Sequence, residues 1–181
     1  RGIAYLNDHI YINSGKDFND RFYLYKYDKQ GEELLETDTL YSAFAGWSTI
    51  TADDQYIYAA DQYVIYAFDP EADTLAGTYP RPNFSPDGLA YDPQKEHFYL
   101  GNGVGAIMQI NKQGEELNFY VIPHEIEGLS WDNWSPGGPF LWAYYRMSEA
   151  SGMIGAVRLD PATGKTTGVG FVGTNLSGNN D

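Results

Sequence analysis

The sequence predicts an all-β fold assembled from four tandem copies of one four-stranded unit. Three observations predict it: a composition rich in aromatic residues, a motif that returns about every 40 residues, and the lack of any stretch with helical periodicity. Tyrosine accounts for 16 of the 181 residues, with 9 Phe and 4 Trp beside it. Flat side chains pack well on a pleated surface, and the length suits one domain with a sizeable core.

The clearest sign of the repeat is a turn segment. The sequence DKQGEEL at 28–34 returns as NKQGEEL at 111–117, and related turns begin at Asp69 and Asp160. Each follows an alternating apolar run, at 22–27, 64–68, 106–110 and 154–159. An Asp or Asn that opens a turn closed by Gly is typical of a hairpin between antiparallel strands. These turns therefore predict the third and fourth strands of each unit.

A second landmark, Gly followed by an apolar and a small residue, predicts the first strand of each unit. Its copies begin at Gly2, Gly46, Gly88 and Gly128, and aromatic segments follow at 10–12, 56–58, 98–100 and 140–142. Four short strands in about 40–45 residues is the period of a β-propeller blade. The Gly then lets the innermost strand approach its neighbours near the axis. We expect one domain, 1–181, with blades at approximately 2–45, 46–87, 88–127 and 128–181.

Two arrangements of the four units remain open. The chain is either a complete four-bladed ring or part of a six- to eight-bladed propeller. An open stack would expose apolar blade faces and unpaired strand edges. In that case closure or self-association would have to cover them.

The phrases PDGLAYD at 86–92 and EGLSWD at 127–132 resemble those of NHL-repeat, YncE-like and SMP-30-like propellers. The pairing of a Tyr-Ile-Tyr strand with an Asp-Pro-x-Thr-Gly turn also resembles that superfamily. The resemblance covers the whole chain and concerns packing and turns. It implies the blade architecture and a bacterial, extracytoplasmic protein (periplasmic, cell-surface or secreted), and it does not specify an activity.

Composition excludes several function classes. The formal charge of −14 argues against nucleic acid and against anionic lipid, because both are bound by Lys and Arg. The absence of Cys excludes disulfides, thiol catalysis and Cys-based zinc sites. No stretch approaches the roughly 18 apolar residues of a membrane helix. The chain begins at Arg1, which we interpret as the start of a mature, trimmed or cut piece.

A divalent cation such as Ca²⁺ is the one cofactor for which the sequence offers candidates. Asp17 and Asp20 lie in an acidic loop, and Asp87 and Glu127 precede two of the Gly landmarks. The spacing of the acidic residues at 69–73 resembles a calcium loop, but Thr and Pro stand where that loop needs Gly and Glu. We interpret 69–73 as an ordinary turn. The glycines at 101–105 are interpreted as a tight loop between strands, because a strand rather than a helix follows them.

The loops that lead into the inner strand and those that join the second and third strands are expected to share one rim. Aromatic rings beside carboxylates and amides at such a rim suit a sugar or a peptide. The sequence therefore predicts a non-catalytic module that binds a protein or carbohydrate partner. The predicted ligand-binding residues are Phe84, Asp87, Asn102, His124, Glu125, Glu127, Tyr145 and Arg146.

The alternative is an enzyme. The Asp-Gly-Leu at 87–89 and the Glu-Gly-Leu at 127–129 resemble segments of SMP-30-like lactonases and of propeller glutaminyl cyclases. The lactonase resemblance implies a divalent metal on the channel axis, with Glu127 as a ligand and Asp87 and Asn102 as companions. Only the fourth unit has Glu at that position, since Ala45 occupies it in the second. The sequence therefore favours the binding module over the enzyme.

Overall fold

The computed structural model describes residues 2–14, 22–40, 47–61, 63–148 and 153–174. It confirms the predicted fold class: sixteen strands form four antiparallel sheets of four strands each, and the described residues contain no helix. Blade one comprises β1–β4, blade two β5–β8, blade three β9–β12 and blade four β13–β16. Within those residues, there is no helix of the length and apolar character that a membrane crossing requires.

Each blade is a meander in which neighbours in sequence are neighbours in the sheet. The strands are β1 (Ile3–Leu6), β2 (His9–Asn13), β3 (Phe22–Asp28), β4 (Leu34–Leu40), β5 (Thr49–Ala52), β6 (Ile57–Ala60), β7 (Val64–Asp69), β8 (Thr74–Pro80), β9 (Gly88–Asp92), β10 (His97–Gly101), β11 (Ala106–Ile110), β12 (Glu116–Val121), β13 (Glu125–Asp132), β14 (Phe140–Ser148), β15 (Met153–Leu159) and β16 (Thr166–Thr174).

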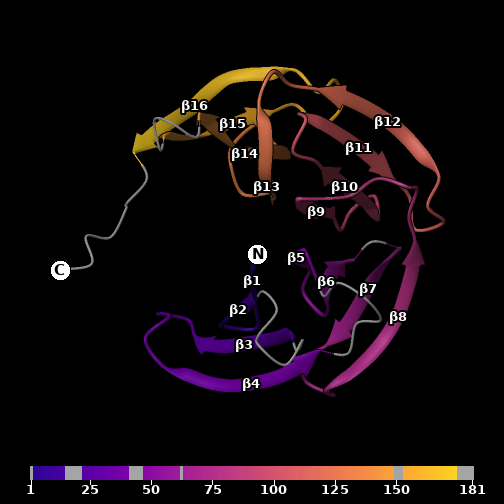
Figure 1. The fold of residues 1–181 in the computed structure, drawn as a ribbon, viewed down its shortest axis with the longest axis vertical. Coiled ribbons are helices and arrows are strands. Elements are labelled where there is room, and N and C mark those ends of the chain that lie inside the picture. The colour runs from indigo at the N-terminus through magenta and orange to yellow at the C-terminus, as the bar shows by residue number, and fades with distance from the viewer. Residues whose placement is uncertain (1, 15–21, 41–46, 62, 149–152, 175–181) are drawn as a thin grey trace.

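The blades stand around a central axis with their first strands innermost (Figure 1). These inner strands contact one another in order, β1 with β5, β5 with β9 and β9 with β13. Figure 1 shows that the described residues form an arc, which is open between blade four and blade one. The inner strands thus line a channel, and one side of it faces the opening.

The recurrent turns fold as their sequence predicts. Asp28 Oδ1 accepts hydrogen bonds from the amides of Glu32 and Glu33, and Asn111 Oδ1 accepts the equivalent bond from Glu115 at 2.9 Å. The glycines at 31 and 114 have φ of +73° and +79°, a region that L residues with side chains rarely adopt. The acidic stretch at 69–73 is likewise the turn between β7 and β8, and the glycines at 101–105 join β10 to β11.

The pairing of the first two strands shows whether the Gly landmark occupies the same position of the inner strand in each blade. Gly88 pairs with Gly101 across β9 and β10, and a Cβ added to Gly88 would lie 2.8 Å from backbone atoms of Gly128 and Leu129 in the next blade. In blade two, however, the residue paired in the same way is Thr49, opposite Ala60. The second unit therefore has its inner strand three residues later than the landmark at Gly46 predicts.

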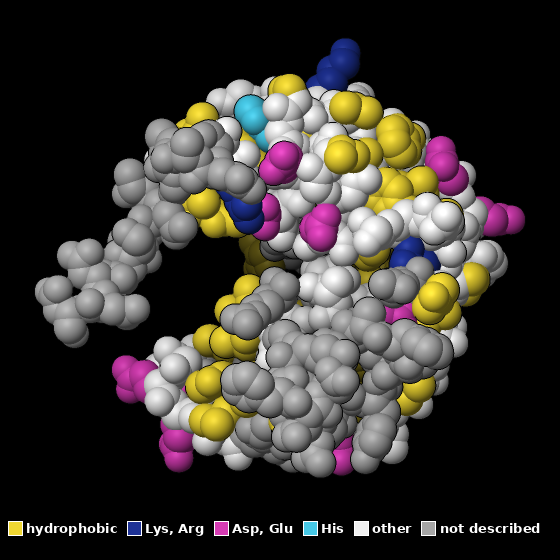
Figure 2. All heavy atoms as spheres, viewed as in Figure 1, with side chains coloured by type: hydrophobic (Ala, Val, Ile, Leu, Met, Phe, Trp, Pro, Cys, Tyr) yellow, Lys and Arg dark blue, Asp and Glu magenta, His cyan; other side chains and the backbone are white. Residues whose placement is uncertain are grey.

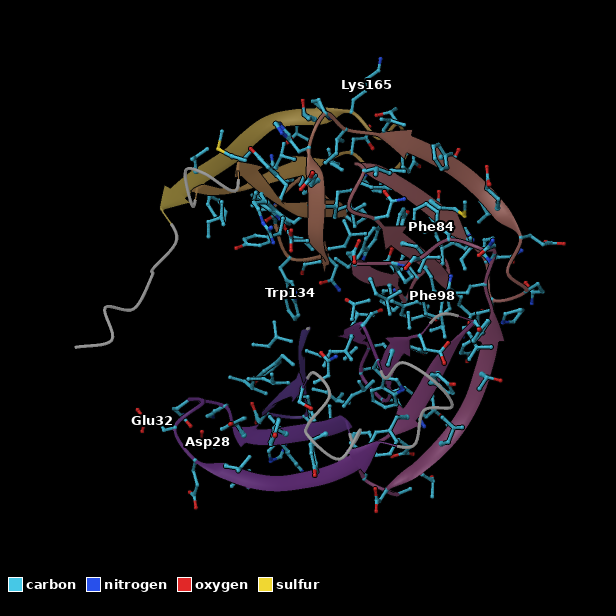
Figure 3. All side chains as sticks on the ribbon, in the orientation of Figure 1. Asp28, Glu32, Phe84, Phe98, Trp134 and Lys165 are labelled. Carbon is cyan, nitrogen blue, oxygen red and sulfur yellow. The ribbon has the colours of Figure 1, made fainter. Side chains whose placement is uncertain are left out.

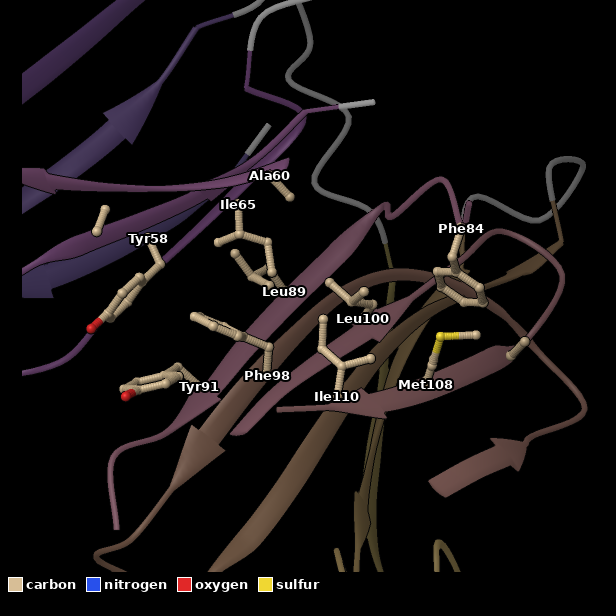
Figure 4. Packing of buried hydrophobic residues seen from close by; sticks show 12 residues of the cluster. Tyr58, Ala60, Ile65, Phe84, Leu89, Tyr91, Phe98, Leu100, Met108 and Ile110 are labelled. Carbon is tan, nitrogen blue, oxygen red and sulfur yellow. The ribbon is translucent and has the colours of Figure 1, made fainter. Parts of the chain in front are cut away.

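The core lies between blades. The cluster in Figure 4 joins Tyr58, Ile65 and Ala67 of blade two to Phe98 and other residues of blade three. Phe98 is fully buried, and its ring centroid lies 5.2 Å from that of Tyr58. Similar clusters hold blade one to blade two and blade three to blade four. Trp47 is a buried member of the first of these.

Candidate ligand-binding cleft

The turns that join the first and second strands of the four blades surround one mouth of the channel. A cavity of about 680 Å³ opens at this mouth, a size within the range of small-molecule sites. The inner strands form its walls and the turns its edge. Its aromatic and polar lining includes Tyr5, Asn7, Asp53, Asp54, Trp131, Asn133 and Trp134.

Trp134 is the most exposed large apolar side chain that the structure describes, at 88%. It lies on the turn between β13 and β14, and Figure 3 shows it near the centre of the ring, over the channel. An indole exposed to this degree offers a flat apolar surface that contact with a ligand would bury. Tyr5, which is 57% exposed, lines the same cavity from β1.

Asp132 holds the Trp134 turn in place. Its Oδ1 accepts hydrogen bonds from the amides of Trp134 and Ser135, both at 3.0 Å, and its Oδ2 accepts one from Trp142 Nε1 at 3.0 Å. Burial alone would raise the pKa of Asp132, but the hydrogen bonds from Ser135, Trp142 and Trp134 outweigh it and lower the pKa to about 2. The carboxylate is therefore ionised at neutral pH and fixes the base of the turn.

Asp53 organises the facing turn in the same way. Its Oδ1 accepts the amides of Gln55 and Tyr56, and its Oδ2 accepts the hydroxyl of Tyr58 at 2.8 Å. Burial, and then the bond to Asp53, raises the pKa of Tyr58, so this hydroxyl remains a donor. Asp54, beside it, is exposed at the edge of the cavity. The cleft thus combines rigid turns with exposed acceptors.

The opposite mouth carries the rim predicted from sequence, and three of its loops are hydrogen-bonded together. Asp87 Oδ2 accepts the amide of Gly103 at 2.8 Å. Asn102 Oδ1 accepts the amides of Val104 and Ala106, and its carbonyl accepts that of Ile126. These bonds hold Asp87 and Asn102 close to the start of β13, where they stabilise the loops.

Other predicted rim residues lie where the start of β13 pairs with the end of β14. Arg146 forms an ion pair with Glu127 at 2.8 Å, with both side chains partly exposed. The rings of His124 and Tyr145 are stacked, with centroids 4.1 Å apart, and Tyr145 is buried. Glu125 is exposed at the first position of β13. Figure 2 views this rim, where acidic, basic and histidine side chains gather over the upper end of β13.

Phe84 is the predicted rim residue with the clearest packing role. It is 8% exposed and belongs to the cluster between blades two and three. Arg81 fixes its loop, because the guanidinium donates to the carbonyls of Asp61, Pro82 and Phe84. Phe84 therefore contributes its ring to the core.

The cation candidates are dispersed. Asp17 and Asp20 lie outside the described residues. Asp87 is engaged by Gly103 and Glu127 by Arg146. In the described part of the chain no three His, Asp or Glu side chains gather as a metal would require.

Fold and channel together define the chain as a β-propeller repeat protein. Neither a protein-family model nor a curated protein matches the sequence. Solved propellers do match the structure, at sequence identities that show the fold alone.

Three solved structures illustrate the likeness. A glutaminyl cyclase of Myxococcus xanthus has a TM-score of 0.66 at 15% identity, and the match covers 92% of this chain and 67% of that one. The Pan2 WD40 domain of Neurospora crassa scores 0.58 at 10% identity, covering 94% and 48%. Hydrazine synthase of Kuenenia stuttgartiensis scores 0.58 at 15% identity, covering 96% and 49%. The chain thus spans about half of two of these chains and two thirds of the third.

Sequence reasoning missed the cleft at the turn mouth. It weighed the loops of the opposite rim and left the turns between first and second strands unexamined as sites. The signal was present at 132–134, where Asp begins a turn whose third residue is Trp.

Proposed function

We propose that the chain is a non-catalytic binding module for carbohydrate, with the ligand seated in the cleft at the turn mouth. The observation that carries the proposal is the exposed indole of Trp134 over a cavity of about 680 Å³. The C–H face of a sugar ring buries apolar area against an indole, while its hydroxyls need acceptors and donors close by. Asp54 and Asn133 offer such groups at the edge of the same cavity.

Rigidity supports this proposal. The turns at Asp53 and Asp132 are fixed by three hydrogen bonds each. Ordering these turns on ligand binding therefore costs little conformational entropy. The acidic cleft also disfavours anionic ligands, since the chain carries a formal charge of −14. A neutral polyol with one flat apolar face fits these conditions better than a nucleotide or a lipid phosphate.

A bacterial, extracytoplasmic location and membership of the NHL, YncE or SMP-30-like group belong to the same proposal. They rest on the resemblance of the blade phrases at 86–92 and 127–132. The rim formed by His124, Glu125 and Arg146 is a second surface of this module. A protein partner there is the outcome we expect if carbohydrate does not bind.

The test is a titration of the protein with a defined panel of oligosaccharides, including cellohexaose, xylohexaose, chitohexaose and mannohexaose. Tryptophan fluorescence and calorimetry would report binding. Trp134→Ala should weaken the best ligand at least tenfold, equivalent to about 1.4 kcal/mol. Phe119→Ala is the matched control, because Phe119 is also exposed, at 49%, but lies on the outer strand β12 away from the cleft. Binding that is insensitive to Trp134→Ala, or no binding to any glycan, would refute the proposal.

The competing candidate is an enzyme with its site near Glu127. The observation in its favour is a second cavity, of about 480 Å³, which Glu127 lines together with Trp142 and Tyr144. The glutaminyl cyclase likeness shows a shared fold and carries no activity to this chain. Cyclisation of a Gln-initiated peptide that Glu127→Gln abolishes would establish it over the binding module.

A further inference from the structure

Blade four presents an uncovered apolar face to the opening of the arc. Tyr144, Ala156 and Phe171 lie opposite one another across β14, β15 and β16. The corresponding residues of blade three are Gly101, Ile107 and Tyr120. Ile107 is fully buried and Tyr120 is 9% exposed, whereas Phe171 is 61% and Tyr144 38% exposed.

Blade one presents the complementary face. Ile3 and Tyr5 of β1 pair with Ile12 and Ile10 of β2, as Leu89 and Tyr91 of β9 pair with Leu100 and Phe98 of β10. All four of the blade three residues are at most 3% exposed, because blade two covers them. Ile3 and Tyr5 are 65% and 57% exposed. The same positions are therefore core in one blade and surface in the other.

The glycines near the axis show the same difference between a covered and an uncovered blade face. A Cβ on Gly88 would collide with the backbone of blade four, but a Cβ on Gly128 would meet only Tyr144 of its own sheet, at 3.9 Å. The space in front of Gly128 is the cavity of about 480 Å³, whose other wall is formed by Gly2, Ile3, Thr49 and Ile50. Figure 2 shows the opening as a hollow that reaches from the rim towards the channel.

We propose that this opening is the seat of a further blade of the same repeat, carried by polypeptide beyond residues 1–181. The argument is continuity with the interfaces already formed. The outward face of blade four corresponds to the face that blade three buries against blade four. The outward face of blade one corresponds to the face that blade four buries against blade three. A sheet that is apolar on both sides, as blade three is, would complete both contacts.

Two observations favour such a sheet over a second copy of the chain. A second copy would bring three further blades with it, and blade one bounds the far side of the opening (Figure 1). Two copies would also bring together formal charges of −14 each.

The experiment appends a copy of residues 88–124, blade three with its following loop, after residue 181. If the opening seats a blade, the extended chain should unfold in one cooperative transition with a higher midpoint. Its binding of anilinonaphthalene sulfonate, a dye that reports exposed apolar faces, should fall at least twofold below that of the 181-residue chain. The matched control carries Asp at the positions of Phe98 and Leu100 in the appended copy only, and it should retain the dye signal.

A second variant keeps the test independent of whether the extension folds. Tyr144→Asp with Phe171→Asp in the 181-residue chain should lower dye binding and leave the denaturation midpoint unchanged. An extended chain with undiminished dye binding, or a double variant that fails to fold, would overturn the proposal. A 181-residue chain that sediments as a dimer, and that the double variant converts to a monomer, would overturn it in favour of a second copy.

Discussion

Leu89 and Ile3 occupy the same position in blades three and one, and truncating each to Ala should have very different effects on stability. Both side chains lose the same number of carbons, and both lie on inner strands. Leu89 is fully buried against blade two, whereas Ile3 is 65% exposed at the opening. The pair therefore isolates burial from chemistry and strand position.

The magnitudes follow from burial. Leu89→Ala removes a fully packed side chain and leaves a cavity, which costs about 2–5 kcal/mol. Full burial of an Ile side chain contributes about 1.5–3 kcal/mol, and Ile3 has about a third of its surface covered. Ile3→Ala should therefore cost about 0.5–1 kcal/mol, with no cavity term because solvent reaches the site.

Equilibrium unfolding in urea, followed by tryptophan fluorescence, measures the free energy of unfolding of each variant. The two values can be compared directly if both variants keep the same m-value, the slope of that free energy against urea concentration. A difference below about 1 kcal/mol between the two variants would refute the reasoning. A cost of 2 kcal/mol or more for Ile3→Ala would mean that something covers blade one in solution.

Three further predictions use the same assay. Gly88→Ala should destabilise the fold strongly, because the added Cβ would strike the backbone of another blade. Gly128→Ala should change the free energy of unfolding by no more than about 0.5 kcal/mol, because its Cβ would meet no other blade. Equal effects of the two substitutions would contradict the open arc. Asp132 has its pKa lowered in the folded state, so its contribution is present above pH 3.8 and is lost as the pH falls through about 2. The midpoint of Asp132→Asn should accordingly fall less than that of the parent between pH 5 and pH 2, and parallel pH profiles would count against this role. Arg81→Met should cost about 1.5–3 kcal/mol by removing the guanidinium from its carbonyl acceptors, and a neutral result would show that the loop holds without it.

The blade repeat could be predicted from sequence because local chemistry specifies it. The Asp or Asn that caps each outer hairpin and the Gly with positive φ at 31 and 114 are visible as residue types at fixed spacing. The inner strand of blade two was displaced in the prediction because Thr49 stands where blades three and four have Gly. Pairing register, which involves Ala60 eleven residues later, decides that position, and no local pattern shows it.

The sites were harder to predict, because they depend on which rim of the channel each loop reaches and on what covers it. The sequence placed Asp87, Asn102 and His124 on one rim, and the structure brings their loops together. It could not show that Asn102 uses its side-chain oxygen on its own loop or that Tyr145 is buried. Whether an aromatic residue is core or surface depends on the next blade, as Tyr120 and Phe171 demonstrate.

Ile3 and Tyr5 belong both to the cleft and to the face of blade one at the opening, and this determines which substitution tests the proposed function. Tyr5 lines the cleft and also belongs to the outward face of blade one. Its counterpart Tyr91 is 3% exposed once blade two packs on it, so a further blade would draw Tyr5 out of solvent as well. Trp134 stands on a turn beyond the sheets, held by Asp132 of its own blade, and would remain exposed. Loss of carbohydrate binding in Trp134→Ala therefore reports on the cleft alone, whereas Tyr5→Ala would mix ligand contact with blade packing.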